Sequence, residues 1–283
     1  MPIPPQDDEG AGLFGPGSIT WRVHADPLMG VAGLTSLLLQ ALHPVAMAGI
    51  DEHSLYRSDP WGRLMRTAEY IGVTTFGTTA EAMRAGSRVR AVHARINGRT
   101  PDGLVYSAED PELLGWVHCC MVGSFLDVVV RGGLALTADE QDRYVAEQVR
   151  AAMLVGLEPD AVPPDRLALA RYFRTMRPQL RVTPAARAAA GLVVAPPMPI
   201  SMVLAIPARP AWASVAGLAF AALPSWARRL YALPEVPGAA GLTDATTTFA
   251  LRSLRAALRG VRAAIPPLRE GPHLRAAKRR LGE

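Results

Sequence analysis

Apolar residues recur at the three- and four-residue spacing of an α-helix along almost the whole chain. Segments that alternate apolar and polar residues and are rich in β-branched side chains, which would predict strands, are nearly absent. We therefore predict an all-α protein. Its 283 residues, 49% of them hydrophobic and 19% charged, are enough to bury a sizeable core. The proline-rich stretch 195–210 is not followed by enough apolar sequence for an independent core, so we predict a single helical domain over 1–283.

Five capping positions predict where helices begin. They are Asp26, Asp59, Thr78 or Thr79, Asp110 and Thr137. Proline follows the three aspartates, and a glutamate stands three residues after Thr137, as in a capping box. We expect the first helix to stop or kink at Pro44, and the third to close in a left-handed turn at Asn97 and Gly98. The apolar helix over 112–130 should lie centrally, and further helices are expected over 164–177, 184–194, 211–231 and 244–264.

Several classes of protein are disfavoured by the sequence. The two cysteines, Cys119 and Cys120, are adjacent, which excludes a disulfide framework and a cysteine zinc site as the organising element. We find no glycine-rich phosphate loop after a strand, no nucleophile elbow and no Cys-x-x-Cys pair. The N-terminal residues lack a secretory pattern, and polar residues and proline interrupt the longest apolar stretch, 28–50. We therefore expect a cytoplasmic protein without a transmembrane segment.

Histidine is concentrated in the first 120 residues, which hold five of the six. His93 follows Val89 by four residues and precedes Ile96 by three, which puts it on the expected core-facing side of its helix. It is either a neutral core histidine bonded to a backbone carbonyl or a ligand to a metal or haem iron, because neutral imidazole donates to both. His118 is expected to be a packed core residue and is the second candidate ligand.

A basic helix face follows Asp59. Arg63 and Thr67 are four residues apart and share this face, whereas Arg66 lies toward the flank. An arginine that enters a core needs an anionic partner, because burying its charge alone is costly. That anion is either Asp59 or Glu69, or the carboxylate of a ligand such as a haem propionate, which suits the guanidinium fork.

A second cluster contains the donor types of a metal site. His43, Asp51, Glu52 and His53 bring two imidazoles and two carboxylates within eleven residues. They span a proline break and a loop, and their spacing matches no known ligand motif. We therefore favour helix capping and loop hydrogen bonds over a metal for these residues.

Seven sequence blocks carry a family resemblance through their order and spacing. They are FGPGSITWR at 14–22, LQALHP at 39–44, HS at 53–54, DPWGRLMRT at 59–67, VHARING at 92–98, YSAEDP at 106–111 and LGWVH at 114–118. Together they resemble the MpaB-type oxygenase family, which includes the rubber oxygenases called latex-clearing proteins. The best match covers about residues 14–180.

The resemblance implies a helical fold with a globin-like core that holds one b-type haem, with His93 as the proximal iron ligand. It also implies that Arg63, Arg66 and Thr67 form the family's Arg-x-x-(Arg/Lys)-Thr motif near the haem. Characterised members of the family use dioxygen to cleave or oxidise carbon–carbon double bonds in isoprenoid chains. Glu52, with Asp51 beside it, is the nearest candidate for the family's catalytic carboxylate.

We therefore expect a haem-dependent oxidoreductase, an oxygenase that acts on a hydrophobic unsaturated small molecule. The alternative is a non-catalytic helical protein that binds haem or lipid, with its arginine-rich C-terminal helices in 240–283 on an anionic surface such as a membrane. Arginines at 252, 255, 259 and 262 form a stripe along one helix face, which is either that contact or simply solvated. Nucleic-acid binding is the weakest interpretation, because no known binding fold or aromatic platform accompanies the arginines.

Overall fold

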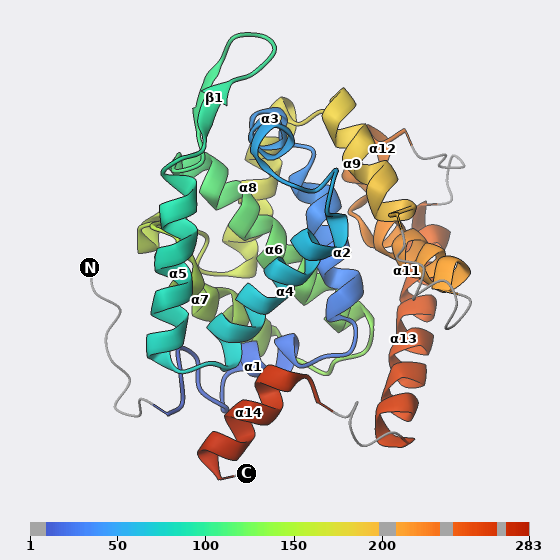
Figure 1. The fold of residues 1–283 in the computed structure, drawn as a ribbon. Coiled ribbons are helices and arrows are strands. Elements are labelled where there is room, and N and C mark those ends of the chain that lie inside the picture. The colour runs from blue at the N-terminus through green and yellow to red at the C-terminus, as the bar shows by residue number, and fades with distance from the viewer. Residues whose placement is uncertain (1–9, 198–207, 233–239, 265–269, 283) are drawn as a thin grey trace.

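The computed structural model describes residues 10–197, 208–232, 240–264 and 270–282, and within these ranges it is mostly helical (Figure 1). The all-α prediction is confirmed. In chain order the helices are α1 (Ile19–His24), α2 (Met29–Gln40), α3 (Pro44–His53), α4 (Pro60–Phe76), α5 (Thr79–His93), α6 (Pro111–Arg131), α7 (Ala138–Leu154), η1 (Pro159–Ala161), α8 (Arg166–Met176), η2 (Arg177–Gln179), α9 (Pro184–Val194), α11 (Ala208–Ala222), α12 (Ser225–Leu230), α13 (Ala240–Ala264) and α14 (Pro272–Leu281). One small hairpin joins β1 (Asn97–Arg99) to β2 (Val105–Ser107).

Four of the five predicted caps are present. Asp59 and Asp110 each accept a hydrogen bond of 2.8 Å from an amide of the helical turn that follows. Thr78 and Thr137 each form a capping box with the glutamate three residues later. These caps satisfy backbone N–H groups that the first turn of a helix leaves without partners. The boundaries therefore follow from local sequence.

The prediction that Asp26 caps the first long helix is wrong. The helix α2 begins at Met29, and the Asp26 carboxylate accepts from the amide of Leu28 (3.0 Å), just before that helix. Asp26 instead pairs with Arg255 of α13. The predicted interruption at Pro44 is confirmed, because α2 ends at Gln40 and α3 leaves it at an angle of 107°.

The left-handed turn predicted at Asn97 and Gly98 is also wrong. Neither residue has a positive φ, and the chain instead enters the hairpin, where Gly98 pairs with Tyr106. Tyr106 is buried against α3, and a Cβ on Gly98 would lie 2.6 Å from its hydroxyl oxygen. Glycine therefore leaves room here for the side chains of Tyr106 and Glu52, and no left-handed turn is involved.

The C-terminal helices differ from the prediction in one respect. The helix expected over 211–231 is two helices, α11 and α12, and Pro224 stands at the N-cap between them. Proline disfavours the α conformation of the residue before it, which explains the break. Residues 198–207 of the proline-rich stretch lie outside the described ranges.

The centre of the fold is α6, as its apolar composition predicts, and α2 packs along it. Trp116 of α6 is fully buried, and its Nε1 donates to the backbone oxygen of Gln40 (3.0 Å). By length and composition α6 could cross a membrane, as could α2 and α3 if the bent pair is counted as one span. In this structure 72% of the apolar window of α6 is buried by the other helices, as in the core helix of a bundle.

Two arginines of the expected basic stripe make contacts with the rest of the protein. Arg255 is 7% exposed, its Nε lies 2.7 Å from Asp26 Oδ2, and its Nη1 donates to the Gly133 carbonyl oxygen (2.7 Å). Arg262 donates to the carbonyl oxygen of Ala25 (3.3 Å). These contacts tie α13 to the junction of α1 and α2 and to the loop after α6. For Arg255 the prediction of a solvated or membrane-facing side chain is wrong, whereas Arg262 stays partly exposed.

Candidate functional site

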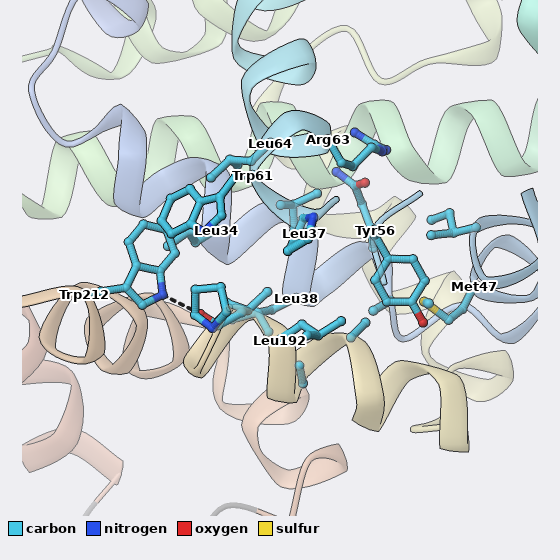
Figure 2. Close-up of a pocket in the computed structure, with 18 residues that line it drawn as sticks. Leu34, Leu37, Leu38, Met47, Tyr56, Trp61, Arg63, Leu64, Leu192 and Trp212 are labelled. Carbon is cyan, nitrogen blue, oxygen red and sulfur yellow. Dashed lines mark hydrogen bonds between the residues drawn. The ribbon is translucent and has the colours of Figure 1, made fainter. Parts of the chain in front are cut away.

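An apolar pocket lies among α2, α3, α4, α9 and α11 (Figure 2). It encloses about 820 Å³ of empty space, a figure that includes its opening to solvent. Its walls are mainly leucine side chains of α2 and alanine, leucine and valine side chains of α9, with Met47 of α3. Its polar lining residues are Gln40, Tyr56 and Arg63. The pocket is also lined by two tryptophans, Trp61 and Trp212, which carry indole N–H groups.

Arg63 of α4 is half-buried and lines the apolar pocket. Its Nη1 donates to the hydroxyl of Thr67, and that hydroxyl donates to the Arg63 carbonyl oxygen (3.0 Å). Burial lowers the pKa of the Arg63 guanidinium, and the nearby charge of Arg66 lowers it further. No carboxylate of the described residues forms an ion pair with Arg63. The site therefore contains a partly desolvated cation without a protein anion.

Both acidic partners that the sequence offers for Arg63 are engaged elsewhere. Asp59 caps α4, and its Oδ2 lies 3.2 Å from Nη1 of Arg66. Glu69 lies 2.8 Å from Nε2 of His273, on α14. The alternative in which Asp59 or Glu69 neutralises Arg63 is therefore wrong, and the alternative of a ligand anion remains.

His93 is the last residue of α5 and is half-buried. Its Nδ1 is buried and has no hydrogen-bond partner within the described structure, so the carbonyl bond of an ordinary core histidine is absent at this atom. Burial lowers the pKa of His93, the charge of Glu109 raises it, and the charge of Arg63 lowers it. The imidazole is thus neutral at pH 7 and near enough to Arg63 to sense its charge. His93 does not line the apolar pocket.

The candidate carboxylates Glu52 and Asp51 lie outside the apolar pocket. Glu52 of α3 accepts a hydrogen bond from the hydroxyl of Tyr106 in the hairpin (2.5 Å). Asp51 accepts from the hydroxyl of Tyr56 (2.5 Å) and from Nε of Arg57 (2.8 Å). The structure thus brings Arg63 to the pocket, with Thr67 hydrogen-bonded to it, but directs the two acidic side chains into other contacts.

Of the remaining candidates, Arg66 and His43 each have a structural partner, and His118 is packed in the core. Arg66 is exposed and paired with Asp59. His43 caps α3 through its Nδ1, which accepts from the amide of Ala46 (3.3 Å), as the interpretation of capping predicts. His118 is 6% exposed in the core, and burial lowers its pKa to about 4.

Two tryptophans of the apolar pocket are residues that sequence analysis does not single out. Trp61 of α4 and Trp212 of α11 meet edge to face with ring centroids 4.7 Å apart. Their indole N–H groups donate to the backbone oxygens of Pro197 and Val193, each at 2.8 Å. Trp61 is part of a family block, but only the packing of α4 near α11 shows that the two rings meet.

The family model described as "ER-bound oxygenase mpaB/B'/Rubber oxygenase, catalytic domain" matches residues 21–263. The chain belongs to this mpaB/rubber oxygenase family. The resemblance seen in the sequence blocks is thereby confirmed. The family is one of oxygenase catalytic domains, and its match covers every element that lines the apolar pocket, from α2 to α11.

Within the mpaB/rubber oxygenase family, the similarity to curated relatives is partial. The uncharacterized protein Rv2237 of Mycobacterium tuberculosis and the uncharacterized protein Mb2261 of Mycobacterium bovis are each 25% identical to this chain over 125 residues. This region is 44% of the chain and 49% of each relative, so the chain spans about half the length of the curated relatives it matches. No solved structure matches the chain significantly.

The residues near Arg63 meet the chemical requirements of a haem site. A neutral imidazole with a buried, unpartnered nitrogen is present at His93. An arginine without a protein anion is nearby and can accept a carboxylate in a bidentate pair. A single protein nitrogen is enough to hold a haem iron, unlike a bare metal ion, which needs several ligands.

Proposed function

We propose that this chain is a haem-dependent oxygenase that acts on a hydrophobic unsaturated small molecule, with dioxygen as the second substrate. The observation that carries this proposal is a neutral His93 whose buried Nδ1 has no partner, close enough to sense the charge of Arg63, which itself lines the apolar pocket without a carboxylate partner among the described residues. Membership of the mpaB/rubber oxygenase family supports the oxygenase chemistry.

In this proposal His93 is the iron ligand of a b-type haem in a globin-like core. Bound haem supplies the redox chemistry and the binding of dioxygen. Burial keeps the pKa of His93 below its usual value, so the imidazole stays deprotonated and available as a ligand at neutral pH. Thr67 holds the Arg63 guanidinium in one orientation, since its hydroxyl bonds both to that side chain and to the backbone.

The apolar pocket is the proposed substrate site. Its lining of leucine, methionine and tryptophan side chains excludes water and favours a nonpolar guest over a sugar or a nucleotide. The two partly exposed indole rings at one end are held by their N–H groups, which presents flat apolar surface to a guest.

Haem titration of the purified chain tests the cofactor. We expect a Soret band that saturates at one haem per chain, and we expect His93→Ala to abolish or greatly weaken haem retention. His118→Ala is the matched control: it removes a second histidine from the core and should lower stability while haem binding persists. Absence of the Soret band in the wild type would overturn the proposal, and loss of haem only in His118→Ala would move the ligand to α6.

Oxygen incorporation separates the oxygenase from the alternative of a non-catalytic haem- or lipid-binding protein, which the apolar pocket also suits. The reduced haem protein is supplied with ¹⁸O-labelled dioxygen and a panel of isoprenoids, and the products are analysed by mass. Labelled product supports an oxygenase. Ligand binding without turnover under any electron supply would favour the binding protein.

A further inference from the structure

The polar groups of the apolar pocket differ in whether a protein partner already satisfies them. The Tyr56 hydroxyl donates to Asp51 (2.5 Å), and the Gln40 amide nitrogen donates to the Ser36 hydroxyl (2.8 Å). Among the described residues, Arg63 has one neutral partner, the Thr67 hydroxyl, for a guanidinium with five N–H donors. The unmet hydrogen-bonding capacity of the pocket is therefore concentrated on a cation.

All four carboxylates between α3 and the end of α4 are engaged away from Arg63. They are Asp51 with Tyr56 and Arg57, Glu52 with Tyr106, Asp59 with Arg66, and Glu69 with His273. Each of these pairings fixes an acidic group in place. A half-buried guanidinium that faces apolar walls is stabilised by an anion, and none of these side chains supplies it.

The end of the apolar pocket that lies opposite Arg63 offers only apolar surface. In Figure 2, Trp61 and Trp212 lie on one side of the pocket and Arg63 lies on the other, with Leu34, Leu37 and Leu38 of α2 between them. The indole N–H groups are already bonded to backbone oxygens, so the tryptophans offer only their ring surfaces. A guest that complements this arrangement has an anionic group at one end and a hydrocarbon chain at the other.

We propose that the apolar pocket binds a long-chain carboxylic acid, with the carboxylate on the Arg63 guanidinium and the chain extending toward Trp61 and Trp212. The bidentate geometry of guanidinium and carboxylate favours a carboxylate over an alcohol or an aldehyde at this end. The inference rests on the proposed function in taking the pocket as the substrate site, and it assigns the carboxylate partner of Arg63 to the substrate instead of to a haem propionate. A haem propionate offers the same chemical group, so the experiment must separate the two carboxylates.

Calorimetric titration of the full chain, with and without added haem, compares hexadecanoate with hexadecan-1-ol below their aggregation concentrations. The wild type should bind the acid at least about tenfold more tightly, the difference expected for a charged hydrogen-bonded pair. Arg63→Gln should abolish this preference and leave the affinity for the alcohol unchanged. Arg88→Gln, which removes an exposed arginine of α5, should retain the preference.

Arg63→Lys keeps the inference testable if Arg63→Gln does not fold. Lysine preserves the charge but not the fork, so part of the preference for the acid should survive. Equal affinity of the wild type for acid and alcohol would overturn the inference. So would an Arg63→Gln chain that loses haem affinity and keeps its preference for the acid, because the carboxylate on Arg63 would then be a propionate.

The two proposals fail in distinguishable ways. A chain that binds hexadecanoate through Arg63 but shows no Soret band on haem titration would refute the haem proposal and leave the carboxylate site standing. A chain that retains haem through His93 but does not prefer the acid would refute the carboxylate site and leave the haem proposal standing.

Discussion

Removing one partner of the ion pair between Asp26 and Arg255 should destabilise this protein more than any surface ion pair does. The two side chains are 2% and 8% exposed, and the Arg255 Nε lies 2.7 Å from Asp26 Oδ2. The substitution Arg255→Met keeps much of the side-chain volume and leaves the Asp26 carboxylate buried beside a single backbone donor, the amide of Leu28.

The expected loss follows from this burial. Stranding one charge of a buried pair costs about 3–5 kcal/mol of the free energy of unfolding. For a chain of this size each kcal/mol shifts Tm by about 2 °C, so the melting temperature should fall by about 6–10 °C. The double variant Asp26→Asn/Arg255→Met removes both charges and should lose less than the sum of the two single variants.

Urea unfolding and thermal melts followed by circular dichroism measure these losses. The control is Arg22→Met, which breaks the ion pair of Arg22 with Glu140, whose side chains are 42% and 32% exposed. This loss should be about 0–1 kcal/mol because water screens the pair. Equal losses for Arg255→Met and Arg22→Met would refute the reasoning, and so would strictly additive losses in the double variant.

Two further predictions concern buried titratable groups of the core. Burial lowers the pKa of His24 to about 3 and that of His118 to about 4, so both stay neutral in the folded protein while the unfolded chain binds protons below about pH 6.5. The free energy of unfolding should therefore fall as the pH falls from about 6.5 toward 4, by up to about 1.4 kcal/mol per pH unit for each histidine. His118→Leu should reduce this dependence on pH, measured by urea unfolding at several pH values. An unchanged dependence in this variant would contradict the assignment. Burial raises the pKa of the Cys119 thiol to about 12 and that of Cys120 well above its usual value. Neither thiol should therefore react with a thiol reagent at pH 8 until the protein is unfolded. Rapid labelling of the native protein would contradict this prediction, because it would show that the thiols are accessible.

Several features of the fold could be predicted from the sequence because they depend on neighbouring residues. The capping boxes at Thr78 and Thr137 each involve two residues three positions apart, and the aspartate caps reach amides of the next turn. The apolar composition of α6 likewise predicts its central place, because an apolar surface on most sides must be buried. Membership of the oxygenase family could also be inferred from the order of short blocks.

Other features were decided by tertiary packing. The partner of Asp26 is 229 residues away in the sequence, and the partner of Glu69 is 204 residues away, so no local pattern indicates either pair. The meeting of Trp61 with Trp212 has the same origin in the packing of distant helices.

The state of Arg63 illustrates the division most clearly. Its helix face follows from a spacing of four residues to Thr67, which is a property of the α-helix itself. Asp59 and Glu69 do not neutralise Arg63, because Asp59 pairs with Arg66 and Glu69 pairs with His273. The helix α14, which packs against α4, carries His273. An ion pair requires both charges to lie within a few ångströms of each other in three dimensions. The sequence alone could therefore indicate the candidate partners of Arg63. The fold paired those carboxylates with other residues and left the Arg63 cation lining the apolar pocket.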